Sequence, residues 1–133
     1  MSENLDLVRS IYADWERGDY SSAEWADPEI EYAWGDGPTP GSWTGATAMA
    51  AALREFMSAW AELRNYPETY RELDDERVLV LVKLSGRGKA SGAELEQMHA
   101  KAAGLFHIRD GKVTKYVQYL ERDRAFADLG LKE

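Results

Sequence analysis

The sequence predicts an α+β fold in which helices pack against one face of a curved antiparallel sheet. Helical apolar spacing occurs in the first half of the chain and near its end, whereas residues 63–120 contain four strand-like runs separated by polar turns. The clearest turn is Asp110-Gly111, a preferred two-residue hairpin sequence between runs over residues 94–108 and 113–120.

The N-terminal residues should form an amphipathic helix over residues 4–17. Apolar side chains recur there at helical spacing, Asn4 is a suitable N-cap, and Gly18 is a suitable terminator. Residues 21–26 can add a short helical turn. Asp27-Pro28 would end this turn, because a residue that precedes proline disfavours the helical conformation.

A short strand, a loop and the longest helix should follow. Residues 30–34 are rich in aromatic side chains, which favours a strand. Residues 35–42 read GDGPTPGS, and these prolines and glycines predict a loop at the surface or over a pocket mouth. Residues 46–61 are rich in alanine and predict a helix. Its apolar face would consist of Met49, Leu53, Phe56, Met57 and Trp60.

Four strands and a final helix should complete the chain. Residues 63–73 predict a strand in which Pro67 removes a hydrogen-bond donor, so this strand should lie at a sheet edge or contain a bulge. Residues 77–86, with VLVLVKL at their centre, should form a largely buried strand. After the hairpin, residues 121–129 should form a small helix that stops at Gly130.

Alternation divides the side chains of the hairpin between two faces. In the first strand, one set should face the interior: Met98, Ala100, Ala102, Gly104, Phe106 and Ile108. Its middle members are the smallest, which leaves space for a closely packed helix or for a ligand. In the second strand, Tyr116 and Gln118 share one face and Val117 and Tyr119 share the other. Alternation alone does not decide which of these faces points inward.

Composition and charge indicate one soluble domain over residues 1–133. A chain of this length buries about two thirds of its unfolded surface, and no apolar run approaches the roughly 20 residues that span a bilayer. We therefore expect no membrane partner. The net charge is −8 and the sequence pI is about 4.8, so the surface should repel phosphate backbones. No nucleic-acid partner is expected.

The sequence also argues against a metal or another cofactor. It contains no cysteine, which excludes disulfides, thiol nucleophiles and thiolate metal sites. The two histidines, His99 and His107, would stand roughly 26 Å apart along an extended strand. The standard phosphate-loop, dinucleotide and metallohydrolase motifs do not occur. The first ten residues contain no apolar segment of the signal-peptide kind, so we expect a cytoplasmic protein.

Short motifs along the chain add a family resemblance. They are the Gly18-Asp19 turn, Trp25-Ala26-Asp27-Pro28 before the first strand, Trp43-Thr44-Gly45 before the long helix, and RDGKVTKYVQYLERDRAFADLGL at the end. With this order of elements, the chain resembles the SnoaL-like branch of the nuclear transport factor 2-like superfamily. That superfamily also contains ketosteroid isomerases, polyketide cyclases and limonene-epoxide hydrolases.

The resemblance covers nearly the whole chain and implies a cone-shaped sheet wrapped round an apolar pocket. The N-terminal and central helices would cover this sheet, and a homodimer would form through its convex face. The ligand would be a small hydrophobic molecule. Because fold does not fix function, the resemblance is weaker evidence for activity than for architecture.

The catalytic residues of the known enzymes in this superfamily are not found at the corresponding positions of this sequence. Ketosteroid isomerases use a Tyr on the first helix and two Asp residues, at positions that correspond to Ile11, Ala33 and Gly104 here. None of these can do the chemistry, although Tyr12 is one residue from the first position. Proton abstraction next to a carbonyl needs a base within hydrogen-bond reach.

The last strand shows the same departure from the known enzymes. The catalytic Asp of the epoxide hydrolases corresponds to Gln118, which cannot act as a general acid or base. The same resemblance implies that the side chains of Tyr116 and Gln118 face the pocket.

The resemblance therefore implies a pocket lined mainly by aromatic and small side chains. Tyr32, Tyr116 and Gln118 would orient a ligand oxygen, although a buried Tyr that bonds a backbone carbonyl is an equally common arrangement. The same large rings could also form a dense core without a ligand. The expected pocket residues are Tyr12, Trp15, Tyr32, Trp34, Phe56, Trp60, Met98, Ala100, Ala102, Gly104, Phe106, Tyr116 and Gln118.

Two residues are weak candidates for a catalytic base. Glu96 shares a face with Met98 and could lie at the pocket rim as an acid-base group, although a solvated strand end is the more common arrangement. His99 could reach the pocket or belong to the convex face.

Two functional hypotheses follow from these residues. The first is a protein that binds, and isomerises or cyclises by cofactor-independent proton transfer, a polyketide or steroid-like carbonyl compound. The alternative is a non-catalytic dimeric module of the same fold, which holds a ligand without transforming it or fills its interior with its own side chains.

Overall fold

The computed structural model describes residues 3–16, 24–35, 41–58, 60–88 and 97–131, and for 56–58, 60–64, 86–88 and 97–100 it describes only the backbone. These residues form three helices and six strands, the α+β class that the sequence predicts. The elements are α1 (Glu3–Glu16), β1 (Ala26–Trp34), β2 (Gly41–Thr44), α2 (Ala46–Ser58), β3 (Trp60–Asp74), β4 (Arg77–Gly88), β5 (Gln97–Arg109), β6 (Lys112–Tyr119) and α3 (Arg122–Leu129).

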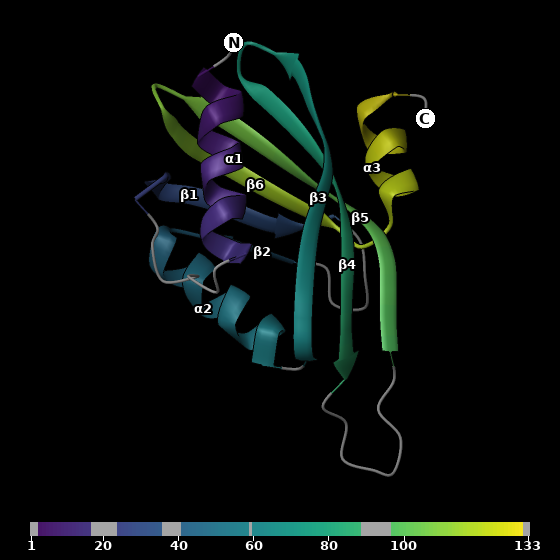
Figure 1. Cartoon of the computed structure of the whole chain (residues 1–133). Coiled ribbons are helices and arrows are strands. Elements are labelled where there is room, and N and C mark those ends of the chain that lie inside the picture. The colour runs from purple at the N-terminus through teal and green to yellow at the C-terminus, as the bar shows by residue number, and fades with distance from the viewer. Residues whose placement is uncertain (1–2, 17–23, 36–40, 59, 89–96, 132–133) are drawn as a thin grey trace.

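The six strands form one curved, open sheet in the order β2-β1-β6-β5-β4-β3. The long strands β3, β4 and β5 stand side by side, and α1 lies across the sheet (Figure 1). The ladders are antiparallel as expected, except that β1 pairs with β6 in parallel. Parallel pairing needs a long connection between the two strands. The chain between β1 and β6 provides one, because it includes four other strands and α2.

Apolar side chains are buried on both faces of the sheet. The inner face, under α1 and α2, carries the larger cluster, which includes Ile11, Met49 and Phe106. The outer face carries a second cluster, in which Leu105 packs with Phe126 of α3. The expectation that helices cover one face therefore fails for α3, because β5 alternates apolar residues onto both faces. The expected homodimer through the outer face stays a prediction.

Two segment boundaries near the first strand were predicted wrongly. Ala26 does not end a helical turn but begins β1, where it pairs with Val113 of β6. Pro28 is tolerated because it falls in an irregular part of this ladder, between Ala26 and Glu31. The rest of the expected turn, 21–23, lies outside the described residues.

The second wrong boundary concerns the expected loop over residues 35–42. Gly41 and Ser42 belong to strand β2, which pairs with β1, and residues 36–40 lie outside the described part. Gly45 follows β2 with a φ of 101°, a conformation that glycine adopts without strain. This turn directs the chain into α2.

The predicted long helix is three residues too long. Helix α2 ends at Ser58, and Trp60 and Ala61 begin β3 by pairing with Gly88 and Arg87 of β4. Trp60 therefore does not belong to the apolar face of this helix. Ladder pairing with β4 takes precedence here over helical spacing, since tertiary context overrides local propensity.

The hairpin between β5 and β6 forms as predicted. Asp110 and Gly111 both have positive φ values, 53° and 75°, as a tight two-residue hairpin turn requires. Gly130 also has the left-handed conformation, with φ 69°, and ends α3 as expected.

Pro67 lies on the edge strand β3, next to a register shift, so both parts of its prediction are confirmed. Its register partner is Val82, and proline has no N–H to donate to the Val82 carbonyl. Arg122 of α3 supplies a donor instead, with its Nη2 atom 3.0 Å from that carbonyl oxygen and its Nε atom 3.4 Å from that of Ala102. The same guanidinium binds the Glu68 carboxylate at 2.7 Å, and this hydrogen bond lowers the Glu68 pKa.

We expect the Arg122→Ala substitution to lower the free energy of unfolding by about 1–3 kcal/mol, because two sheet carbonyls lose a donor. Urea unfolding monitored by tryptophan fluorescence would measure the change. Arg124→Ala is a matched control on the same helix. Arg124 is exposed and pairs with Asp128 four residues later, so its loss should cost less than about 0.5 kcal/mol. Equal effects of the two substitutions would contradict this role of Arg122.

His107 is half-buried on β5, between its register partners Arg77 and Lys115. Burial, followed by the positive charges of Lys115 and Arg77, lowers its pKa, and the opposing effects of Asp74 and Glu76 are smaller. Protonation of His107 is therefore easier in the unfolded chain than in the folded one. Above the ordinary histidine pKa, His107 is neutral in both states and its full contribution to folding stability is present. This contribution is lost as the pH falls from that value toward the lower pKa that His107 has in the folded protein.

We predict that the wild-type protein loses more stability than His107→Gln when the pH falls from about 7.5 through the ordinary histidine pKa of about 6.5. Thermal unfolding temperatures of both proteins across this range would measure the difference. Parallel curves would show that His107 has the same pKa in the folded and unfolded chains.

Candidate functional site

A row of aromatic side chains crosses four neighbouring strands on the inner face of the sheet. Trp43 of β2 pairs with Tyr32 of β1, Tyr32 with Tyr116 of β6, and Tyr116 with Phe106 of β5. Directly opposite residues share a face, so the four rings form one continuous band. The sequence contains no direct sign of this alignment, because it depends on the parallel pairing of β1 with β6.

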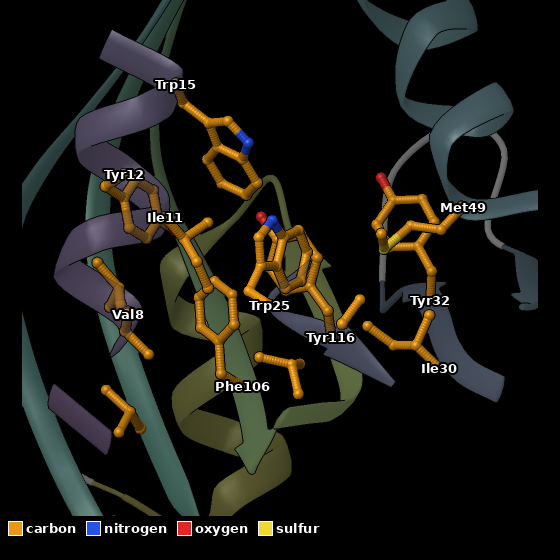
Figure 2. Packing of buried hydrophobic residues seen from close by; sticks show 14 of the residues in the cluster. Val8, Ile11, Tyr12, Trp15, Trp25, Ile30, Tyr32, Met49, Phe106 and Tyr116 are labelled. Carbon is orange, nitrogen blue, oxygen red and sulfur yellow. The ribbon is translucent and has the colours of Figure 1, made fainter. Parts of the chain in front are cut away.

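The rings of this band pack closely. Ring centroids lie 5.5 Å apart for Tyr32 and Trp43, 5.6 Å for Tyr32 and Tyr116, and 4.5 Å for Phe106 and Tyr116. Helix α1 packs over the band. There the ring of Tyr12 meets the ring of Phe106 edge to face, with 5.9 Å between the ring centroids (Figure 2). Rings at these distances attract one another beyond the effect of their buried area. This part of the interior is therefore filled by the protein's own side chains.

The next row along the sheet contains the polar groups of the site. Gln118 of β6 pairs with Trp34 of β1 on one side and with Gly104 of β5 on the other. The missing side chain at Gly104 leaves room for the Tyr12 hydroxyl. A Cβ atom at Gly104 would lie 2.9 Å from the Tyr12 hydroxyl oxygen, which is too close for an ordinary contact.

A chain of hydrogen bonds joins these groups, which can both donate and accept. Tyr32 donates its hydroxyl proton to the Gln118 Oε1 atom, and the Tyr32 oxygen is hydrogen-bonded in turn by Trp34. On its other side, Gln118 hydrogen-bonds the Tyr116 hydroxyl and lowers the Tyr116 pKa, as an amide donor would.

The last bond in this chain joins Tyr116 to Tyr12. This hydrogen bond lies between two buried hydroxyls, each of which can donate or accept. The hydrogen bonds thus link Trp34, Tyr32, Gln118, Tyr116 and Tyr12 in one buried chain.

Burial fixes the protonation state of the three tyrosines. It is the largest influence on each and raises the pKa of Tyr12, Tyr32 and Tyr116 above the ordinary value. All three hydroxyls therefore stay neutral at physiological pH and act as hydrogen-bond donors and acceptors rather than as bases.

No charged side chain is buried among the residues that the structure describes in detail. The two weak catalytic candidates are not placed by the structure. Glu96 lies outside the described residues, and for His99 only the backbone is described, where it pairs with Ser85.

The structure brings together eight of the expected pocket residues in or beside this band, and Trp34, half-buried, packs against the same cluster. For the other expected residues only the backbone is described, on α2, β3 and β5. The residues brought together are Tyr12, Trp15, Tyr32, Ala102, Gly104, Phe106, Tyr116 and Gln118. The residues without described side chains are Phe56, Trp60, Met98 and Ala100.

Sequence reasoning missed three residues near the site: Trp25, Trp43 and Tyr70. Trp25 and Trp43 can be read from the sequence, but they lie outside the predicted strands and long helices. Apolar spacing therefore could not show which way their side chains point. Trp25 packs on Trp15 at a centroid distance of 6.1 Å, and Tyr70 meets Tyr12 at 6.2 Å. Their positions depend on contacts between segments that are far apart in the sequence.

Within the described residues, no group of three or more His, Cys, Asp or Glu side chains is arranged to hold a metal ion. The helices described there are also too short or too polar to cross a membrane.

Several solved structures share this fold. An NTF2-like protein of unknown function from Burkholderia pseudomallei K96243 is 20% identical, with 96% of this chain and 97% of that chain covered and a TM-score of 0.78. A protein from Jannaschia sp. CCS1, described as a SnoaL-like polyketide cyclase, is 15% identical over 87% of this chain and 83% of that chain, with a TM-score of 0.71.

A third similar structure is that of TerC co-crystallised with polyporic acid. It is 19% identical, covers 96% of this chain and 98% of that chain, and has a TM-score of 0.73. At these identities the three structures establish the fold and not an activity.

No curated protein is significantly similar to the chain in sequence. A family model described as the SnoaL-like domain matches residues 8–116, which include most of α1 and the whole aromatic band. The chain therefore belongs to the SnoaL-like domain family.

Proposed function

We propose that the protein binds a small hydrophobic carbonyl compound of the polyketide or steroid type, with the ligand's carbonyl oxygen bonded to the Tyr12 hydroxyl. The observation that supports this proposal is the buried hydrogen-bond chain that reaches Tyr12 beside Gly104, and in the proposal Tyr12 donates from this chain to the ligand. Tyr32, Gln118 and Tyr116 act through this chain.

The chain makes Tyr12 a strong hydrogen-bond donor. Each hydroxyl that accepts a hydrogen bond becomes a better donor, and this effect accumulates along a buried chain. In an environment of low dielectric, the terminal O–H of Tyr12 would polarise a carbonyl more than a solvated hydroxyl can. The same environment favours a ligand with one oxygen and a largely apolar body.

The surroundings of Tyr12 suit such an apolar body. Next to Gly104 on β5 is Ala102, whose side chain also belongs to the inner cluster, and Val80 and Val82 of β4 are their register partners. These residues are buried in the inner cluster and make the surroundings of Tyr12 apolar, while Trp34 and Gln118 are only partly buried. Ligand sites are commonly of this kind, mainly apolar with a few well-placed polar groups.

Binding is the primary function in this proposal, and isomerisation or cyclisation would be a second step. A hydrogen bond from Tyr12 would stabilise an enolate oxygen, but proton transfer also needs a base. Glu96 and His99 remain the candidates for that base. The alternative is the non-catalytic module, which would use the same hydrogen bond for binding alone.

The similar proteins support a small organic ligand. TerC was co-crystallised with polyporic acid, and the Jannaschia protein is described as a polyketide cyclase. The present chain shares their fold over most of its length.

We predict that Tyr12→Phe weakens binding of androstenedione about tenfold, which corresponds to one hydrogen bond of about 1.4 kcal/mol. Androstenedione has carbonyl acceptors and no hydroxyl donor, and isothermal titration calorimetry would measure its dissociation constant. Tyr66→Phe is the matched control, because Tyr66 is 46% exposed and lies on the outer face of β3, and binding should not change. Anthraquinone provides a second, flat aromatic ketone for the same comparison.

Two results would contradict the proposal. One is that neither ketone binds to the wild-type protein. The other is that Tyr12→Phe, shown to be folded by circular dichroism, binds both ketones as tightly as the wild type does.

Catalysis is tested separately by deuterium uptake next to the androstenedione carbonyl in heavy water, followed by proton NMR. If the protein is an enzyme, we expect uptake to be faster with the wild type than with Tyr12→Phe. Uptake at the protein-free rate, together with tight binding, would assign the protein to the non-catalytic alternative.

A further inference from the structure

The outer face of β3, β4 and β5 carries a group of basic side chains. One cross-strand row contains Tyr66 of β3, Lys83 of β4 and Lys101 of β5, because Lys83 is in register with both of the others. Directly opposite residues share a face, and this row spans about 10 Å across the three strands. Arg71 lies on the same face, since its register partner Leu79 belongs to the outer cluster. We call Tyr66, Arg71, Lys83 and Lys101 the basic patch.

The side chains of the basic patch are accessible. The Lys83 side chain is 62% exposed, and Tyr66, which is 46% exposed, is the only exposed large hydrophobic residue among the described side chains. Arg71 and Lys101 are exposed as well, and neither makes an ion pair with a residue that the structure describes. The basic patch can therefore reach another molecule directly.

The charges of the basic patch are only partly compensated within the described residues. Lys83 and Lys101 stand directly opposite each other on β4 and β5, and like charges in this position destabilise a sheet. The Glu68 carboxylate lies 3.7 Å from the Lys83 Nζ atom, but it also binds Arg122 at 2.7 Å and is therefore shared. A partner that brings further negative charge would relieve the remaining repulsion.

The basic patch contrasts with the rest of the protein. The whole chain has a net charge of −8, so a cluster of cations with one acid beside it creates a local field of opposite sign. Such a field attracts and orients a partner of complementary charge. Tyr66 adds an apolar contact in the same row, and tyrosine is frequent among the residues that dominate binding energy. This combination suits an acidic partner that also carries an apolar side chain.

We propose that the basic patch docks an acidic segment of another protein, whose carboxylates pair with Arg71, Lys83 and Lys101 and whose apolar side chain packs on Tyr66. Two other occupants suit the patch less well. A nucleic acid would extend beyond the patch and meet the negative charge of the surrounding protein. If two copies of this chain met through the patch, their cations would face each other. The proposal is independent of the proposed ligand, because Tyr12 lies on the other face of the sheet.

A fluorescein-labelled peptide of repeated Glu-Glu-Leu units is a suitable probe, and fluorescence anisotropy would measure its dissociation constant. We expect binding that weakens about tenfold when the NaCl concentration rises from about 50 to about 300 mM, because salt screens exposed charges. A Gln-Gln-Leu peptide of the same length has no carboxylates and should not bind. Equal binding of both peptides would overturn the proposal.

Lys101→Glu should weaken binding of the acidic peptide about tenfold, because an attraction becomes a repulsion. Tyr66→Ala should weaken it about fivefold. Arg54→Glu is the matched control, since it makes the same change of charge at an exposed position of α2, which covers the inner face. This control and Tyr12→Phe should bind the peptide as the wild type does. Circular dichroism would show that each variant is folded, and Lys101→Gln provides a milder change that should weaken binding about threefold.

The remaining outcomes test the choice of partner. No binding of the acidic peptide at low salt, or an equal loss in Arg54→Glu and Lys101→Glu, would overturn the proposal. If oligothymidylate of equal charge binds as tightly as the peptide, the patch recognises polyanions in general and the proposal also fails. A wild-type dimer in sedimentation that Lys101→Glu dissociates would assign the patch to a second copy of this chain instead. Ketone binding is measured separately, so none of these results decides the proposed function.

Discussion

The contact between the Tyr12 hydroxyl and the backbone of Gly104 determines how helix α1 sits on the sheet. Any side chain at position 104 would collide with the Tyr12 oxygen, since even a Cβ atom would lie 2.9 Å from it. Glycine thus allows a buried polar group to approach the centre of the sheet. Once Tyr12 is there, its ring meets Phe106, Trp15 and Tyr70 edge to face. The aromatic interior is built around this one close approach.

A buried hydroxyl must also be hydrogen-bonded, and this requirement explains the composition of the neighbouring strands. Tyr116 satisfies Tyr12, Gln118 satisfies Tyr116, and Tyr32 donates to Gln118. The amide of Gln118 suits the middle of this chain because it has both a donor and an acceptor. An ionised Asp or Glu there could only accept hydrogen bonds. Gln118 thus completes a chain that a carboxylate could not donate to.

Much of the fold was predictable because it depends on local periodicity. Helix α1, the hairpin at Asp110-Gly111, the edge position of Pro67 and the end of α3 at Gly130 all follow from spacing or from the backbone preferences of single residues. The errors occur where pairing with a distant strand overrides a local signal. Trp60 fits the apolar spacing of the preceding helix but pairs with Gly88 of β4. Ala26 was expected to belong to a short helical turn but pairs with Val113 of β6. The expected pocket residues were found largely by resemblance, and eight of them do converge.

The sequence by itself determined the class of the fold, the small residues at the centre of β5 and the residue types of the site, because these follow from alternation and side-chain chemistry. Only the tertiary structure decided which groups meet. The parallel register of β1 with β6 aligns Tyr32 with Tyr116, and the approach of α1 brings Tyr12 to Gly104. The row of Tyr66, Lys83 and Lys101 is likewise a property of the β3–β4 and β4–β5 registers. A hydrogen bond depends on positions known to a fraction of an ångström, and residues far apart in sequence reach such positions only when the whole sheet has formed.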